Sequence, residues 1–154
     1  MPNYRTHSLT NLFLILPFAT WGAYRLFEPA QEEGATFIGC FIYATLFMSP
    51  DVDLAHQNKL FSLKGLLTLP FRLYALLFSH RGLSHMPIVG TLTRLIYLSV
   101  LSLIIYALIY QTIPSFSTLL ELIKSHKALI LWGLFGAFLA DIAHETLDFL
   151  NTKS

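Results

Sequence analysis

Residue types that bind divalent metals gather in a few short polar clusters of an otherwise apolar chain. The chain has 154 residues, of which 55% are hydrophobic and 12% are charged. An ionisable side chain in apolar surroundings is strongly unfavourable unless it is paired or ligated. These clusters therefore point to a metal site. The candidate metal ligands are His7, Asp51, Asp53, His80, His85, Asp141, His144 and Asp148.

The segment DIAHETLD, near the carboxyl-terminal end, has metal-ligand types at helical spacing. Asp141, His144 and Asp148 stand three and four residues apart, so on an α-helix they project within an arc of about 60°. Glu145 lies at the margin of that arc and is a candidate acid or base in catalysis. A solvated helix end is the alternative, but the strongly apolar residues 131–140 that precede the segment favour ligation.

The segment HRGLSH holds two histidines, an arginine and a glycine. His80 and His85 would point about 140° apart on a continuous helix, but Gly82 can turn the backbone so that both imidazoles face one centre. Arg81 is then left to bind an anionic substrate, because its planar guanidinium matches a phosphate. The alternative is a polar loop with ordinary surface histidines, and the presence of the other clusters favours the metal site.

The segment PDVD follows the second apolar stretch, which Pro50 ends. Asp51 and Asp53 in this turn are placed to ligate one metal ion or to bridge two. A plain turn is the alternative, since aspartate is common at turns, and the spacing does not choose between the two aspartates. His7 lies at the membrane entry of the first apolar stretch and is the remaining candidate ligand.

The apolar stretches that position these clusters predict a membrane protein. A mean hydropathy of +0.59 is typical of an all-α, integral membrane helical bundle, here a single membrane-embedded metal-binding domain over residues 1–154. Pro17 is expected to bend the first span. Residues 65–78, which carry Pro70 and Arg72, are too short to cross and are expected to form an interfacial or re-entrant helix. The four expected transmembrane helices cover residues 9–27, 35–48, 95–113 and 128–143.

Positive charge is distributed unevenly over the two faces of this four-span arrangement. Seven Lys and Arg residues fall on one face and three on the other, which predicts that both termini are cytoplasmic. In a bacterium the protein would lie in the plasma (inner) membrane. All the clusters then emerge at the cytoplasmic face, where they can converge at one membrane-surface site.

Composition excludes other kinds of site. Ten Lys and Arg against nine Asp and Glu give no field that would hold nucleic acid as a standing partner. Cys40 is the single cysteine, so neither an internal disulfide nor a thiolate cage can form. The remaining nitrogen and oxygen ligands suit Zn best and also admit Mn or Fe. They are too many for one tetrahedral site, which indicates more than one ion.

The order of His7, PDVD, HRGLSH and a terminal HxxxD resembles the membrane-bound metal-dependent hydrolases, including the LexA-regulated group, and relatives known only as metal-binding proteins. It is more distantly similar to the superfamily of zinc-dependent phospholipase C and single-strand nucleases, which are helical multi-zinc phosphoesterases. Hydrolase relatives often have serine after the second histidine of HRGLSH, where this chain has Met86 and Pro87. The ligands that the resemblance implies are Asp51 or Asp53, His80, His85, His144 and Asp148.

The favoured interpretation is a membrane-bound metal-dependent hydrolase that cleaves phosphoesters, with membrane lipid as partner and as a candidate substrate. Arg81 would clamp the phosphate, and Glu145 would act as the acid or base. The alternative is a non-catalytic metal-binding or metal-transport membrane protein. Transport would favour ionisable groups near the membrane midplane, so their clustering at one face favours the enzyme.

Overall fold

The computed structural model describes residues 4–48, 65, 68–77 and 88–151, and every regular element in these ranges is a helix. The predicted all-α class is therefore confirmed for this part of the chain, which holds no strand. The helices are α1 (Tyr4–Thr10), the π-helix η1 (Asn11–Ile15), α2 (Leu16–Phe27), α3 (Gln31–Phe47), α5 (Phe71–Leu77), α6 (Val89–Tyr110), α7 (Phe116–Ser125) and α8 (Lys127–Asn151).

The first helical stretch runs from α1 through η1 into α2, and the π turn ends at Ile15, two residues before Pro17. Proline has no N–H to close an i→i−4 hydrogen bond, and its ring crowds the preceding turn, which explains why the helix widens here. Asn11, the first residue of the π turn, is buried and donates from Nδ2 to the carbonyl of Ala140 on α8, at 3.1 Å. This bond joins the amino-terminal helices to α8.

Helix α3 begins with a cap from the side chain of its third residue. The backbone N–H of Ala30 donates to the side chain of Glu33 at 2.9 Å, and Glu32 and Glu33 place negative charge at the helix amino-terminus, where it is stabilising. Helix α7 begins at a second cap, because the side chain of Ser115 accepts from the backbone N–H of Thr118. None of the helices expected from the sequence includes the residues of α7.

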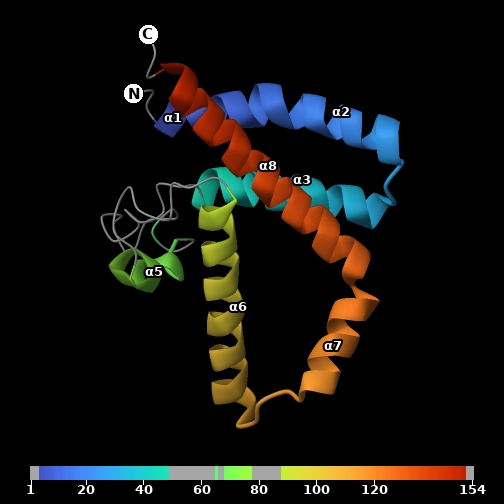
Figure 1. Ribbon diagram of the computed structural model, residues 1–154, viewed down its shortest axis with the longest axis vertical. Coiled ribbons are helices and arrows are strands. Elements are labelled where there is room, and N and C mark those ends of the chain that lie inside the picture. The colour runs from blue at the N-terminus through green and yellow to red at the C-terminus, as the bar shows by residue number, and fades with distance from the viewer. Residues whose placement is uncertain (1–3, 49–64, 66–67, 78–87, 152–154) are drawn as a thin grey trace.

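The core forms where α8 crosses α3 (Figure 1), and this is the most extensive helix contact of the described residues. Gly136 lets the two backbones approach closely, since a Cβ at this position would lie 2.4 Å from the carbonyl oxygen of Phe37. Phe71 and Tyr74 of α5 join the same core, so the segment that was expected to be interfacial has buried side chains. The buried core residues are Phe41, Ala44, Met48, Phe71, Tyr74, Ala137 and Ala140.

Two helices of the described residues, α6 and α8, are long and apolar enough to span a membrane. The four-span bundle is therefore not confirmed. The first expected span is divided among α1, η1 and α2, and α3 has 17 residues, which is at the lower limit for crossing a bilayer. Helix α6 runs away from the layer formed by α2, α3 and α8, and the chain returns through α7 (Figure 1).

Candidate metal centre

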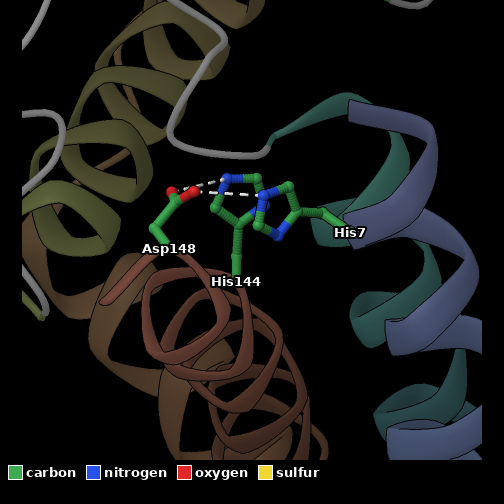
Figure 2. A group of neighbouring side chains, drawn as sticks. All are labelled: His7, His144 and Asp148. Carbon is green, nitrogen blue, oxygen red and sulfur yellow. Dashed lines mark ion pairs between the residues drawn. The ribbon is translucent and has the colours of Figure 1, made fainter. Parts of the chain in front are cut away.

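Three predicted ligands from distant parts of the chain meet in one cluster, which consists of His7 on α1 and of His144 and Asp148 on α8 (Figure 2). The two imidazole rings stack, with their centroids 4.2 Å apart and an angle of 24° between their planes. Both rings turn an Nε2 atom toward the carboxylate of Asp148. Nε2 of His7 lies 3.1 Å from Oδ1, and Nε2 of His144 lies 3.6 Å from Oδ2.

These separations fit a tetrahedral divalent ion. Two ligands that each lie about 2.0 to 2.1 Å from such an ion are separated by about 3.3 Å. The two nitrogen–oxygen distances of 3.1 and 3.6 Å lie on either side of this value. One ligand atom from each of the three residues lies within 4.8 Å of the others, so small side-chain rotations would close the cluster around one ion. Two imidazoles and a carboxylate are a ligand set that zinc accepts, and the described residues supply three of the four ligands of a tetrahedral site.

The three residues of the cluster differ in their exposure to solvent. His7 and His144 are 3% and 4% exposed, whereas the side chain of Asp148 is 35% exposed. Of the three ligands, Asp148 is therefore the one that reaches the protein surface. Nδ1 of His7 is buried and has no hydrogen-bond partner among the described residues, so only its Nε2 has a partner in the cluster.

The local structure explains why the cluster forms. His144 and Asp148 stand four residues apart on α8, which places them on one helix face, one turn apart. His7 precedes Asn11 by four residues, so it shares the helix face that Asn11 presents to Ala140. The hydrogen bond from Asn11 therefore holds the face of His7 against α8, close to His144.

Asp141 lies two turns before Asp148 on α8 and is not among the three grouped ligands. Its Oδ2 accepts hydrogen bonds from Nη2 of Arg94 at 2.6 Å and from Oγ1 of Thr91 at 2.5 Å. Arg94 and Asp141 are 0% and 2% exposed. The structure thus brings two of the three predicted α8 ligands into the cluster and gives Asp141 a buried ion pair.

Glu145, the candidate acid or base, is next to His144 in the sequence and is half-buried. Its Oε1 is buried and accepts no hydrogen bond from the described residues. The other predicted site residues lie outside the described residues, so their roles stay predictions. They are Asp51, Asp53, His80, Arg81 and His85.

Three buried residues that sequence analysis did not single out bind α8 near the site: Asn11, Thr91 and Arg94. Arg94 had a recognisable signal, because a cation at the start of an apolar helix needs a buried partner and Asp141 is the matching anion of another apolar helix. Asn11 and Thr91 have no such signal, since their roles depend on contacts with α8 that no local pattern specifies.

Comparison with known proteins agrees with a metal centre. The chain is similar to an uncharacterized protein of Aquifex aeolicus (strain VF5), with 26% identity over 127 residues, which covers 73% of this chain and 86% of the relative. No solved structure matches the chain. A family model described as "Uncharacterized metal-binding protein (DUF2227)" matches residues 2–154, a range that includes all three members of the cluster. The chain therefore belongs to this family of metal-binding proteins.

Proposed function

We propose that this protein is an integral membrane metalloenzyme that holds a divalent ion at His7, His144 and Asp148 and hydrolyses phosphoesters. The observation that carries the proposal is the meeting of these three side chains, from helices about 140 residues apart in sequence, with ligand atoms within 4.8 Å of one another. The family description names metal binding. Hydrolysis is proposed because the described residues supply three ligands, which would leave a tetrahedral ion one position for water or substrate, and because Glu145 lies next to His144.

The ligand set favours zinc, with Mn or Fe as the other candidates. A bound ion of this kind supplies Lewis acidity toward a phosphoryl oxygen and toward water. Structural zinc sites use four protein ligands, whereas catalytic sites keep a position for water or substrate. Further ligands from Asp51, Asp53, His80 and His85 would enlarge the site to more than one ion, and this part of the proposal rests on the sequence.

Glu145 is proposed as the group that accepts and returns a proton during hydrolysis. It follows His144 directly and is half-buried, and Oε1 has no hydrogen-bond donor among the described residues. A carboxylate beside a metal centre is the usual general base of metal-dependent hydrolysis. Arg81 is proposed to bind the phosphate, because its planar fork of donors matches two phosphate oxygens.

A membrane location is supported by the surface of α6. Only 6% of its most apolar 18-residue stretch is buried. The helix has 22 residues and a length of about 33 Å, which is enough to cross a hydrocarbon core of about 30 Å. Large apolar side chains such as Ile96, Leu108 and Ile109 are more than half exposed. Such a surface is stable in lipid and unfavourable in water. The uneven Lys and Arg distribution supports cytoplasmic termini, which reporter fusions at the carboxyl-terminal end would test.

The alternative is a non-catalytic metal-binding or metal-transport protein. A transport site is expected near the middle of the membrane-spanning helices. In this structure, His7 lies in the first described helix, and Asp148 lies three residues before the end of α8. The position of the cluster at helix ends therefore favours the enzyme over the transporter.

The test begins with metal analysis of the protein purified in detergent. His7→Ala and His144→Ala should each lower the bound metal, whereas His126→Ala should not, because His126 is exposed and its Nδ1 forms hydrogen bonds with Ser125 and Leu122 of the preceding helix turn. Equal metal content in all three variants would refute the site. A hydrolysis assay with phospholipids and with soluble phosphodiesters then follows. A fully loaded protein that cleaves neither class would leave the non-catalytic alternative.

A further inference from the structure

The contacts of Arg94 join three helices at one buried point. Nε donates to the carbonyl of Gly90 at 3.0 Å, Nη1 to the carbonyl of Met48 at 2.5 Å, and Nη2 to Oδ2 of Asp141 at 2.6 Å. Each of the three guanidinium nitrogens therefore has an acceptor, from α6, from the end of α3 and from α8. Thr91, one turn earlier on α6, donates to the same carboxylate oxygen.

We propose that the Arg94–Asp141 pair is a positioning device for the metal centre, and that it fixes the rotation of α8 so that His144 and Asp148 face His7. This inference rests on the proposed metal site. Asp141 stands seven residues before Asp148, which is nearly two full turns, so the two carboxylates lie on the same side of α8. Holding Asp141 therefore sets the direction in which Asp148 points.

The required accuracy shows why such a device matters. A ligand atom lies about 5 Å from the helix axis, so a rotation of α8 by about 20° moves it by about 1.7 Å. Metal–ligand distances tolerate deviations of only about 0.2 Å. The hydrophobic effect is non-directional, so it does not by itself select one rotation of α8 about its axis. A charged pair with three helices as partners limits them strongly, because a rotation would leave a buried charge without its hydrogen bonds.

Asp141 could alternatively act as a metal ligand itself. Its Oδ1 is buried and has no hydrogen-bond partner among the described residues, so one oxygen remains for a cation. The two roles differ in what they predict. A ligand sets the number of ions and the strength of binding directly. A positioning residue acts through the geometry of His144 and Asp148, and its partner Arg94, a cation, should matter as much as Asp141 itself.

The experiment measures Co²⁺ and Zn²⁺ affinity and the visible spectrum of bound Co²⁺ for the full chain in detergent. Arg94→Lys keeps the charge and loses the fork, and it should weaken binding by about tenfold and alter the spectrum at unchanged stoichiometry. Asp148→Asn serves as the ligand control and should weaken binding more. The double variant Arg94→Met/Asp141→Leu guards against misfolding, since apolar replacement of a whole buried pair is often tolerated. It should keep its helix content and still bind about tenfold more weakly than wild type.

Wild-type affinity and spectrum in the Arg94→Lys and double variants would overturn the positioning role while leaving the metal site intact. Loss of one ion equivalent in the double variant, with normal binding in Arg94→Lys, would instead make Asp141 a ligand and also overturn the inference. A wild-type protein that binds neither Co²⁺ nor Zn²⁺ would overturn the proposed function together with this inference.

Discussion

Gly136→Ala should weaken the contact between α3 and α8. A Cβ at position 136 would lie 2.4 Å from the carbonyl oxygen of Phe37 and 3.2 Å from the backbone nitrogen of Phe41, whereas ordinary contacts begin at 3.4 Å. The two helix backbones must therefore separate locally by about 1 Å. Such overpacking of a core costs about 1 to 3 kcal/mol.

The same substitution gains about 1 kcal/mol of helix propensity, which has to be separated from the contact. Gly39→Ala provides the control, because Gly39 is also helical and exposed, and its Cβ would meet nothing within 4 Å. Gly39→Ala should stabilise the protein by the propensity term alone. The difference between the two variants then isolates the contact, at about 2 kcal/mol in free energy of unfolding. For a chain of this size that corresponds to a Tm difference of about 4 to 8 °C.

Trp132 gives this experiment a local probe. Its ring meets Phe37 of α3 edge to face, with a centroid distance of 6.1 Å, so its fluorescence reports the α3–α8 contact. The second tryptophan, Trp21, is exposed and is replaced by phenylalanine in both variants to leave one signal. Thermal unfolding is followed at one scan rate and in one detergent. If Gly136→Ala melts at the same temperature as Gly39→Ala, the close approach of the two helices is wrong.

The remaining predictions concern the site. Asp148→Asn keeps the shape of the carboxylate and loses its charge, so Zn²⁺ affinity should fall by at least about tenfold in a chelator competition assay. The exposed control Glu121→Gln should not change the affinity. Equal affinities of the Asp148→Asn variant and the wild type would exclude Asp148 as a ligand. Asn11→Ala removes the hydrogen bond to Ala140, so the free energy of unfolding, measured by thermal unfolding, should fall by about 1 kcal/mol. Chelator competition should also show a lower metal affinity. An unchanged affinity would show that this bond does not hold His7 in place. Arg81→Lys should leave metal content intact and lower phosphoester hydrolysis by about tenfold, or about 1.4 kcal/mol, and full activity would remove its role as a clamp.

Local spacing predicted the parts of the site that lie on one helix. The four-residue interval between His144 and Asp148 places both on one face of α8, and the structure has them there. The same spacing suggested Asp141 as a third ligand, but spacing carries no information about Arg94, which approaches from another helix. The grouping of His7 with α8 involves the hydrogen bond of Asn11 to Ala140, which is a tertiary contact.

The helical class of the fold was predictable from local sequence, whereas some helix boundaries were not. The all-helical class follows from the apolar stretches, and α6 overlaps the third expected span. The first span was expected to bend at Pro17. The structure divides this span among α1, η1 and α2, and the hydrogen bond of Asn11 to α8, which no local pattern specifies, lies at the start of the π turn. Hydropathy also missed α7, because its polar residues lower the average even though Ser115 caps it. Side-chain hydrogen bonds decide where these helices begin and break, and an average over apolar residues does not contain them.

The distance along the chain between His7 and its two partners has a consequence for biosynthesis. His7 leaves the ribosome about 140 residues before Asp148. At about 5 to 20 residues per second, the amino-terminal helix therefore waits on the order of 7 to 30 s for the rest of its site. During that interval the nascent protein has one member of the cluster and cannot sequester an ion there. Metal capture at this position would therefore mark chains in which α8 has been synthesised and docked, and shorter products would stay in the apo form.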